Sequence, residues 1–550
     1  MEQPTIQTIT STPFSDQRPG TSGLRKKTRI FMQPHYLENF VQSVFNAVRE
    51  KVTPDFSQET LVVGGDGRYY NRTAIQTILR LAVANGFHQV MIGRGGILST
   101  PAVSAVIRRR GALGGLVLSA SHNPGGIDAD FGIKYNIRNG GPAPEVVTEN
   151  IYQHTLKLTS YQTIDYKEID LDTESSFTIG NTQVTIFDPL LDYTAIMQEL
   201  FDFAALQAMF ARGFRMQFDA MHAVTGPYAH HILENCLGAP SGTVVNGTPK
   251  EDFAKGHPDP NLVYAADLVK FLSTANAPDF GAASDGDGDR NLILGRNFFV
   301  TPGDSLAIIA EYAQKAIPGY NTGLSGVARS MPTSAAVDRV AKALGVDSYE
   351  TPTGWKFFGN LMDANKCTIC GEESFGTGSN HVREKDGLWA VLCWLSILAH
   401  TGKSVVEVAQ DHWQKFGRSY YQRYDYEGID ATGANKMIAS LREKLTSLVG
   451  TPLADTIINC ADDFSYTDPI DGSVSTRQGI RLLLADGSRI IFRLSGTGTE
   501  GATLRVYFER YKQDGGQSDI NQVLKPLVDG AKQILQLKDF CSVDEPTVIT

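Results

Sequence analysis

Short apolar runs alternate with helix-spaced segments along most of the chain. Residues 61–66 form an apolar run that ends in glycine and aspartate, which predicts a strand followed by a turn. Residues 73–85 carry apolar side chains at helical spacing, and residues 89–93 return to a strand pattern. This β–α–β order predicts a largely parallel sheet. Similar runs recur without a strict sequence repeat, so we expect the same α/β unit three times, with later strands near residues 215–220, 281–284 and 323–328.

The last part of the chain has a different pattern. Helical spacing at residues 433–449 and 521–537 flanks a group of strand-like runs, at 479–484, 489–493 and 503–511. Strands grouped between helices predict an α+β domain. The polar segment 159–185 is interpreted as an excursion before the second domain. We therefore expect four domains, with the limits 1–190, 191–302, 303–418 and 419–550.

Composition narrows the class of protein. With 550 residues, of which 42% are hydrophobic and 20% charged, the chain is expected to be a soluble globular protein with several cores. Its net charge of −10 includes no long run of either sign, which argues against nucleic-acid binding. The N-terminus lacks an apolar signal segment, and the most apolar stretch, 388–398, is too short to cross a bilayer. We expect a cytoplasmic protein without membrane association and a buried helix at 388–398.

Six cysteines are too few for a disulfide framework in a chain of this length. Cys367 and Cys370 form a CxxC pair, but no second CxxC or HxxxH accompanies it, which disfavours a zinc site. We expect two reduced cysteines on or near a buried strand.

The first loop that suggests chemistry is 119–126, Ser-Ala-Ser-His-Asn-Pro-Gly-Gly. It follows the apolar run 115–118, and a strand that stops at small, polar, Pro/Gly-rich residues displays its side chains. Ser121, next to His122, is therefore a candidate nucleophile or phosphate carrier. The alternative interpretation is a serine that caps a helix or turn.

The second loop contains three aspartates, Asp285, Asp287 and Asp289, separated by glycines and followed by Arg290. Carboxylates at this spacing can converge on one hard cation, and the glycines let the backbone fold tightly enough for that. An EF-hand does not fit, because Arg290 stands where that motif needs glycine and Arg296 stands where it needs glutamate. The pattern favours Mg²⁺, with a phosphoryl oxygen as a natural further ligand.

Two further loops carry groups suited to a phosphorylated sugar. Glu372 and Ser374, two residues apart in a glycine-bounded loop, can bind neighbouring sugar hydroxyls. Residues 493–499, with Arg505 downstream, combine arginine, hydroxyls and glycine-exposed N–H groups into a phosphate cradle. Taken singly, each loop is also compatible with an ordinary turn. Similar polar and basic residues occur at 19–26, 351–356 and 383–387.

Taken together, these loops resemble the motifs of the α-D-phosphohexomutase superfamily, and of its phosphoglucomutase branch in particular. The resemblance extends from Gly20 to about Tyr511, and the motifs keep the family's order. One departure is Ser119, where the family more often has threonine, which has the same hydroxyl chemistry. The branch is indicated by residues 353–358, 371–376 and 383–389. The resemblance implies three related α/β domains with mixed sheets and a C-terminal α+β domain, arranged around a central active-site cleft.

The resemblance also implies a role for each loop. Ser121 would carry the phosphoryl group and, with Asp285, Asp287 and Asp289, would hold the metal ion. The implied catalytic residues are Ser121, His122, Lys385, Arg25 and Lys134. The implied substrate-binding residues are Thr353, Gly354, Trp355, Glu372, Ser374, Arg290, Arg493, Ser495, Thr497, Arg505, Thr21 and Ser22.

The implied reaction interconverts α-D-glucose 1-phosphate and glucose 6-phosphate by intramolecular phosphoryl transfer. Phosphoserine would give its phosphoryl group to the 6-hydroxyl, and the resulting glucose 1,6-bisphosphate, which also serves as activator, would turn over in the cleft. Mg²⁺ and nearby cations stabilise the charge of the group in transfer. Lys385 and His122 are both candidates for the general base. The expected partners are the phosphosugar alone, and the expected assembly is a monomer or weak dimer.

Three alternatives remain open at this point. A related mutase could act on mannose or N-acetylglucosamine phosphates. A catalytically silent relative could serve as a scaffold, although such a protein is expected to lose the serine or a metal-binding aspartate. A phosphatase could use the same serine, histidine and metal but would release inorganic phosphate.

Overall fold

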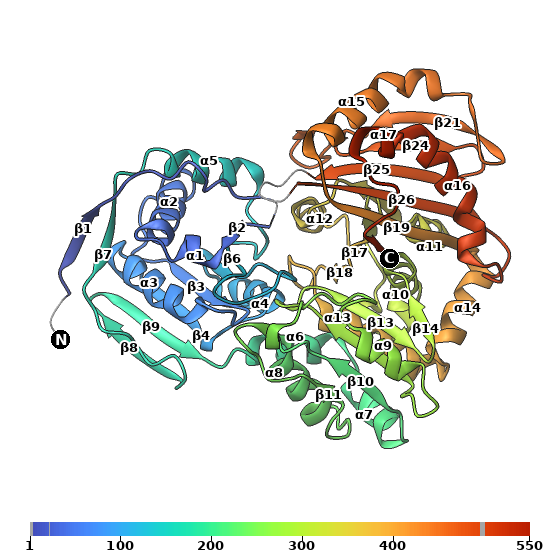
Figure 1. The fold of residues 1–550 in the computed structure, drawn as a ribbon. Helices are drawn as coiled ribbons and strands as arrows, with labels where there is room; N and C mark the ends of the chain where they lie inside the picture. The colour runs from blue at the N-terminus through green and yellow to red at the C-terminus, as the bar shows by residue number, and fades with distance from the viewer. Residues whose placement is uncertain (1–3, 21, 496–500) are drawn as a thin grey trace.

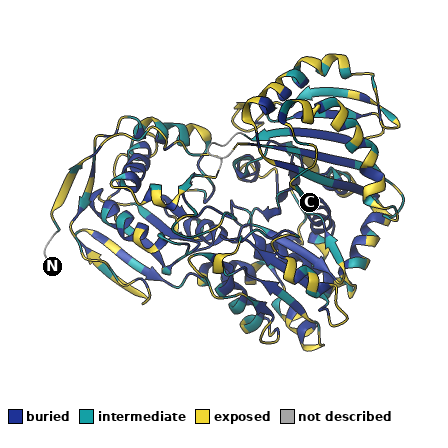
Figure 2. Cartoon of the chain, in the orientation of Figure 1, coloured by how far each residue is buried: buried dark blue, intermediate teal, exposed yellow. Residues whose placement is uncertain are grey.

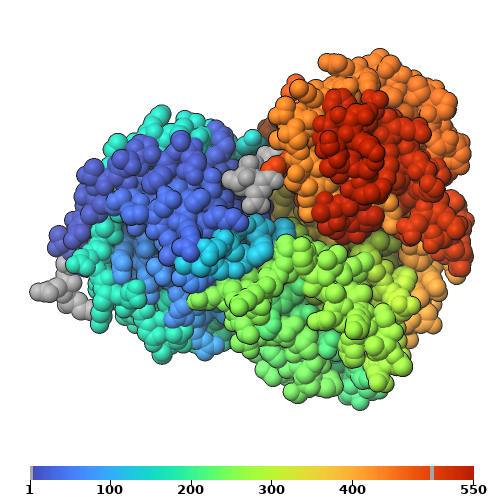
Figure 3. All heavy atoms as spheres, in the orientation of Figure 1, coloured from blue at the N-terminus to red at the C-terminus, as the bar shows by residue number. Residues whose placement is uncertain are grey.

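The computed structural model describes residues 4–20, 22–495 and 501–550. Its four large sheets define four parts, which we name domains I to IV in chain order (Figure 1). Domain I, blue to teal, lies at one side, domain IV, orange to red, lies at the other, and domains II and III connect them. The surface is indented between domains I and IV (Figure 3).

Domain I is built on a seven-stranded mixed sheet. In spatial order the strands are β2 (Leu24–Lys27), β6 (Asp130–Ile137), β5 (Gly114–Leu118), β3 (Thr60–Gly65), β4 (Gln89–Ile97), β9 (Thr182–Phe187) and β8 (Ser175–Ile179). Strands β5, β3, β4 and β9 are parallel, and β6 runs antiparallel to β5. The helices of this domain are α1 (Thr28–Phe31), α2 (Tyr36–Lys51), α3 (Asn71–Ala84), α4 (Thr100–Arg110) and α5 (Glu145–Thr155).

Domains II and III repeat the centre of this sheet. Domain II has the strand order β11 (Val244–Val245), β10 (Met216–Asp219), β12 (Phe280–Ser284), β13 (Asn291–Gly295) and β14 (Phe298–Val300). Domain III has β16 (Asp347–Thr351), β15 (Gly326–Ser330), β17 (Ile369–Glu372) and β18 (Gly376–Ser379). In all three domains the first three strands of the unit are parallel, and the fourth runs antiparallel to the third. The threefold recurrence expected from the apolar runs is confirmed.

The loops of interest occupy one topological position in this repeated unit. Ser121 lies between β5 and β6, the three aspartates lie between β12 and β13, and Ser374 lies between β17 and β18. Each loop therefore connects the third strand of its unit to the antiparallel fourth strand. The carboxyl ends of parallel strands are where open α/β sheets hold ligands.

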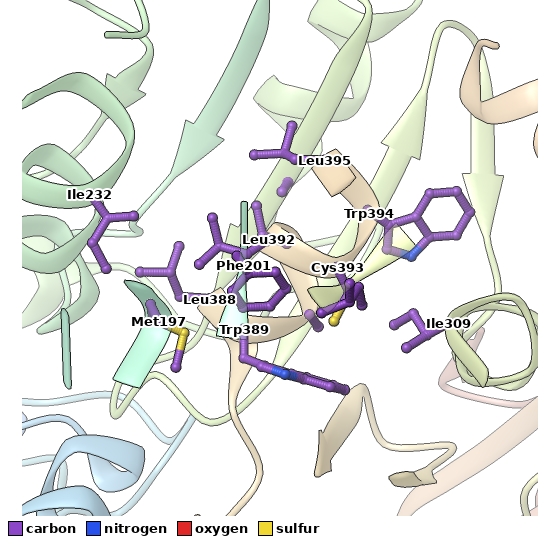
Figure 4. Close-up of a cluster of buried hydrophobic side chains, with 14 of the residues drawn as sticks. Met197, Phe201, Ile232, Ile309, Leu388, Trp389, Leu392, Cys393, Trp394 and Leu395 are labelled. Carbon is purple, nitrogen blue, oxygen red and sulfur yellow. The ribbon is translucent and has the colours of Figure 1, made fainter. Parts of the chain in front are cut away.

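Helices cover these sheets and supply the largest core. In Figure 4 side chains of α13 (Gly387–Thr401), among them Trp389 and Trp394, lie among Met197, Phe201, Ile232 and Ile309 from domains II and III. The expected buried helix at 388–398 is thus confirmed, and it joins two domains. The remaining helices of domains II and III are α6 (Leu191–Leu200), α7 (Phe203–Ala211), α8 (Thr225–Ala229), a π-helix (His230–Cys236), α9 (Ala266–Leu272), α10 (Pro302–Ala316), α11 (Ala336–Leu344), α12 (Trp355–Asp363) and α14 (Val405–Phe416).

Domain IV has the expected α+β composition. Its seven-stranded sheet has the order β20 (Pro452–Leu453), β21 (Thr456–Asp463), β24 (Ile480–Leu484), β25 (Arg489–Ser495), β26 (Ala502–Lys512), β19 (Arg418–Ile429) and β27 (Val548–Ile549). The central strands β25 and β26 are mostly buried, whereas the outer surface of α15 is exposed (Figure 2). The helices are α15 (Ala431–Leu448), α16 (Ile520–Leu535) and α17 (Leu537–Cys541).

The segment 159–185 differs from the expected excursion. Its first strand, β7 (Ser160–Ile164), pairs with β1 (Ile6–Thr10), and β8 and β9 extend the sheet of domain I. Val184 and Ile186 are buried at alternating positions of β9, which is the pattern of a half-buried strand within a polar segment.

Two other expectations can be compared with the structure. Cys367 and Cys370 are buried and unbridged, and Cys370 lies on β17, as expected. In the part of the chain that the structure describes, no single helix has the length and hydropathy needed to cross a membrane. Only the strongly bent pair α13 and α14 meets these criteria together.

Candidate active site

Ser121 meets the aspartate loop of domain II. Its hydroxyl donates a hydrogen bond to Asp285 Oδ2 over 2.9 Å, and the serine is almost fully buried. Its backbone is left-handed, with φ 53°, and its N–H donates to Ser119 Oγ at 2.7 Å. The turn after β5 therefore presents the hydroxyl to domain II rather than using it as a helix cap.

Asp285, Asp287 and Asp289 form one buried acidic group. One carboxylate oxygen from each lies within 4.8 Å of the other two. Asp287 Oδ1 and Asp289 Oδ1 are buried and have no hydrogen-bond partner. Buried carboxylate oxygens that converge without donors have the chemistry that a hard divalent cation binds. The residues present therefore fit a metal ion.

The ionisation of this group is uneven. Burial, followed by repulsion from Asp287 and Asp289, raises the pKa of Asp285 well above its ordinary value. Burial alone would also raise the pKa of Asp287, but attraction to Lys134 and a hydrogen bond from the Thr100 hydroxyl outweigh it and lower this pKa. That hydroxyl donates to Asp287 Oδ2 at 2.7 Å. The hydrogen bond to Thr100 thus leaves Asp287 Oδ1 as the oxygen of this carboxylate without a partner.

Basic side chains surround the acidic group. Lys385 Nζ lies 3.3 Å from Asp289 Oδ2, and Arg290 Nε lies 3.9 Å from Asp285 Oδ2. Burial would lower the pKa of Lys385, but Asp289 and other carboxylates raise it above its ordinary value. Arg25, on β2, has a buried Nε without a partner, and its charge interacts with Asp287. Lys134 instead donates to Glu384 of domain III at 2.9 Å.

His122 lies beside the serine, with its Nδ1 3.4 Å from Ser121 Oγ. Its ring is parallel to that of His257, with 6.2 Å between the ring centroids. Burial, followed by repulsion from Arg290 and Arg25, lowers the pKa of His122 well below its ordinary value. The imidazole is therefore held neutral, in the form that accepts a proton.

The loop of domain III places further polar groups near these residues. Glu372 is buried, and its Oε1 accepts a hydrogen bond from the Gly354 N–H at 2.9 Å. Thr353 Oγ1 and Trp355 Nε1 are buried without hydrogen-bond partners. Ser374 is half-buried in the same loop. The neighbouring Phe375 carbonyl accepts the N–H of Asn291 at 2.8 Å, which ties this loop to domain II.

Domain IV contributes arginines from adjacent strands. Arg493 on β25 lies directly opposite Arg505 on β26, an arrangement that repels unless an anion or a carboxylate offsets it. Arg493 Nη1 lies 3.8 Å from Glu373 Oε1, and Arg505 Nε lies 3.7 Å from Asp425 Oδ1.

Four hydroxyl residues complete the comparison of expected and observed positions. The Ser495 hydroxyl donates to the Thr503 carbonyl at 3.2 Å, and Ser22 is exposed. Thr497 and Thr21 lie outside the described residues.

Three polar residues that contact the site are not named individually in the sequence analysis, although Glu384 lies within the segment 383–389. Thr100 donates a hydrogen bond to Asp287, and Glu384 accepts one from Lys134. The guanidinium of Arg68 donates to the Ser121 carbonyl at 2.8 Å. In the sequence, the pattern around Thr100 indicates the start of a helix after Ser99, and the pattern around Glu384 indicates a basic turn. Arg68 follows the end of β3, just as the serine loop follows β5. Polar residues directly after a predicted parallel strand are the signal that could have identified it.

Comparison with known proteins agrees with this geometry. Models for the α/β/α domains I, II and III of phosphoglucomutase/phosphomannomutase and for the C-terminal domain of phosphoglucomutase-1 match residues 16–162, 192–297, 302–416 and 418–547 respectively. A phosphoglucomutase of Rhizobium radiobacter is 58% identical over 547 residues, which cover 99% of this chain and 100% of that protein. A chloroplastic phosphoglucomutase of Arabidopsis thaliana is 53% identical over 99% of this chain and 89% of its own length.

A solved structure is similar over the full length. The crystal structure of pp63/parafusin from Paramecium, an exocytosis-sensitive phosphoprotein described as a phosphoglucomutase, has a TM-score of 0.93 and 49% identity, with 100% of both chains covered. A phosphomannomutase fold from Thermus thermophilus aligns with a TM-score of 0.67 at 21% identity over 96% of this chain and 100% of that chain, which is a likeness of fold alone. The chain belongs to the phosphoglucomutase branch of the α-D-phosphohexomutase superfamily.

Proposed function

We propose that this protein is a phosphoglucomutase, which interconverts α-D-glucose 1-phosphate and glucose 6-phosphate through phosphorylated Ser121 and glucose 1,6-bisphosphate. The observation that carries the proposal is the meeting of Ser121 Oγ with Asp285 at 2.9 Å, beside two partnerless carboxylate oxygens. A serine placed against a metal-binding group and surrounded by basic side chains suits a phosphoryl carrier. Full-length relatives named phosphoglucomutase support the same substrate.

Asp285, Asp287 and Asp289 would hold Mg²⁺, with a phosphoryl oxygen on Ser121 as a further ligand. When bound, the ion offsets negative charge on the phosphoryl oxygens during transfer. Arg25, Arg290 and Lys385 add positive charge from three different elements around the same oxygens. Lys134 supports the site through its ion pair with Glu384.

In the first half-reaction, the 6-hydroxyl oxygen of glucose 1-phosphate bonds to phosphorus as the bond from phosphorus to Ser121 Oγ breaks. The hydroxyl proton passes to a base, and we favour His122 for this role because its Nδ1 lies 3.4 Å from Ser121 Oγ, the oxygen that exchanges the phosphoryl group. The base returns the proton to Ser121 Oγ as that oxygen leaves. In the second half-reaction, the bond from phosphorus to O1 breaks as Ser121 Oγ bonds to the 1-phosphoryl group, and the serine proton passes to O1. The serine is phosphorylated again, and glucose 6-phosphate is released.

The substrate-binding groups come from all four domains, with Arg290 from domain II. Glu372, Ser374 and Thr353, with Gly354 and Trp355, would bind the sugar. Arg493, Ser495, Arg505 and Thr497 would bind the phosphate that is not in transfer, and Thr21 and Ser22 would approach it from domain I. Two chemically different ends must use this cradle in turn, which requires the intermediate to reorient in the cleft.

We also propose the domain limits 1–190, 191–302, 303–418 and 419–550, and a monomer or weak dimer in the cytoplasm. Each large sheet falls within one of these ranges, except that β19 begins at Arg418. Relatives include chloroplastic as well as cytoplasmic proteins, so fractionation of the source cells tests the location. Sedimentation of the purified protein tests the assembly.

The test of the proposed function is a coupled mutase assay with intact-mass measurement of the wild type and of Ser121→Ala. We expect the wild type to convert glucose 1-phosphate with Mg²⁺ and catalytic glucose 1,6-bisphosphate. It should carry a phosphate-sized mass increment that Ser121→Ala lacks. Ser121→Ala should be inactive but keep the wild-type melting temperature.

Three results would contradict the proposal. Steady release of inorganic phosphate would indicate a phosphatase, and equal rates with mannose 1-phosphate would remove the preference for glucose. Full activity of Ser121→Ala would remove the serine from the mechanism.

A further inference from the structure

The backbone of Ser121 is held at both of its polar groups. Its φ of 53° lies in the left-handed region, which a non-glycine residue keeps only where surrounding contacts hold it. Its N–H donates to Ser119 Oγ, and its carbonyl accepts from Arg68 Nη2 at 2.8 Å. Gly286 packs so closely on this carbonyl that a Cβ atom at position 286 would lie 2.4 Å from the oxygen. The direction of the serine hydroxyl therefore depends on these contacts.

Arg68 is a fully buried cation that ties both ends of the serine loop. Its Nε lies 3.0 and 2.9 Å from the two carboxylate oxygens of Asp66, and both side chains have no exposed surface. Its Nη1 donates to the Asp130 carbonyl at 2.8 Å, where the chain enters β6. The guanidinium also packs over the Phe253 ring of domain II, 5.2 Å from its centroid. The guanidinium of Arg68 thus contacts the Ser121 carbonyl, the start of β6 and a side chain of domain II.

Such an ion pair is a costly means of stabilising a fold. A buried pair loses its hydration, and apolar side chains of similar volume often serve the fold equally well. The fork of donors on arginine, however, can hold an anion and two carbonyls in fixed directions, which lysine cannot do. The geometry suits a residue that fixes the position of another group.

We propose that Arg68, oriented by Asp66, is a positioning residue for phosphoryl transfer. It holds the Ser121 carbonyl so that Ser121 Oγ stays within hydrogen-bond distance of Asp285. The proposal rests on the proposed function, since it assigns a role in the transfer step. The contacts of Arg68 with described residues are to domain I and Phe253, away from the sugar-binding loop, so it is expected to act on turnover and not on substrate binding.

A paired-variant experiment separates positioning from stability. Arg68→Gln leaves Asp66 buried without its cation, whereas the double variant Asp66→Asn with Arg68→Gln leaves a neutral pair. We expect Arg68→Gln to lower both the melting temperature and kcat, and the double variant to regain most of the melting temperature. Its kcat should remain about 10- to 100-fold below wild type, with KM within about threefold, because small misplacement of a reacting group costs this much in rate.

Two further variants make the test decisive. Arg68→Lys keeps the charge beside Asp66 but loses the fork, so it should fold normally and still lose about tenfold or more in kcat. Arg49→Lys is the matched control, since Arg49 also holds a backbone carbonyl in domain I, at Asn85, but lies away from the serine loop. It should change the melting temperature and leave kcat unchanged.

Single-turnover experiments provide the direct readout. Transfer from phosphorylated enzyme to glucose 1-phosphate, followed by intact mass, should slow in the Arg68 variants by the same factor as kcat. Recovery of kcat together with the melting temperature in the double variant, or wild-type kcat in Arg68→Lys, would overturn the positioning role. A wild type that lacks mutase activity would refute the proposed function itself and, with it, the role of Arg68.

Discussion

Thr100→Val tests how the aspartates of the proposed metal site are oriented. Thr100 begins α4 in domain I, and its hydroxyl donates to Asp287 Oδ2 at 2.7 Å across the domain boundary. This bond occupies one carboxylate oxygen and leaves Oδ1 without a partner. Valine keeps the shape of threonine but cannot donate, while the Thr100 N–H bond to the Asp287 carbonyl is a backbone contact and remains.

The size of the effect follows from the chemistry of the bond. A hydrogen bond to a charged group contributes about 1.5–3 kcal/mol, and groups that orient metal ligands change metal affinity by about 10- to 100-fold. The Thr100 hydroxyl bonds to Asp287 both in the metal-free and in the metal-bound protein, so part of its contribution cancels in the free energy of Mg²⁺ binding. We therefore expect an effect at the lower end of this range. Thr100→Val should raise the Mg²⁺ concentration for half-maximal activity about tenfold, which is equivalent to about 1.4 kcal/mol.

The assay combines activity with an independent binding measurement. Mutase rates are titrated with Mg²⁺ at saturating substrate, and the rise in melting temperature with Mg²⁺ gives the affinity without catalysis. Ser99→Ala is the control, because Ser99 caps the same helix through the Ala102 N–H. It should cost about 1 kcal/mol of stability without changing Mg²⁺ dependence. An unchanged Mg²⁺ requirement in Thr100→Val, or an equal change in Ser99→Ala, would refute the reasoning.

Two other variants test the sugar loop and the serine contact. Burial raises the pKa of Glu372, so the carboxyl group of Glu372 binds a proton more readily in the folded protein than in the unfolded chain. The free energy of unfolding therefore falls as pH rises above the ordinary range of glutamate pKa values. Glu372→Gln should therefore melt higher than wild type at pH 7, turn over more slowly, and lose this thermal advantage towards about pH 4; equal melting at pH 7 would contradict this. Gly286→Ala should reduce Ser121 phosphorylation and activity at least tenfold, since its Cβ would meet the Ser121 carbonyl at 2.4 Å. Gly359→Ala, in a helix with open space around it, should keep full activity, and an active Gly286→Ala would show that the serine backbone tolerates displacement.

Local patterns predict the elements and loops of this chain because they depend on nearby residues. A continuous apolar stretch is enough to predict α13, and strand runs that end in polar, glycine-rich turns identify the loops of Ser121 and Asp285. In β9, by contrast, polar neighbours obscure the alternating Val184 and Ile186. Pairing with β4 determines that strand, and pairing across the sheet is not encoded in the segment itself.

Contacts between domains are the part of the site that local patterns do not predict. Lys134 is predicted near the serine, but its bond to Glu384 joins residues 250 positions apart. Asp287 likewise depends on Thr100, 187 positions away. Such pairs depend on how the domains pack, and many surface lysines and glutamates have the same local sequence character. The Asp66–Arg68 pair is local in sequence, but its target, the Ser121 carbonyl, is identified only by the fold.

The repeated topology explains why loops with unrelated sequences meet. In each α/β unit the loop between the third and fourth strands lies at the carboxyl end of a parallel strand, so Ser121, Asp285 and Ser374 have equivalent positions. Thr100 and Asp287 join the first unit to the second, and a β-bridge between Arg290 and Gly376 joins the second to the third. Packing of the units therefore brings the Ser121 hydroxyl, the aspartate group and the Ser374 loop together without any shared motif. Because the backbone supplies the position of each loop, the three loops can carry different side chains, and a threefold structural repeat needs no sequence repeat.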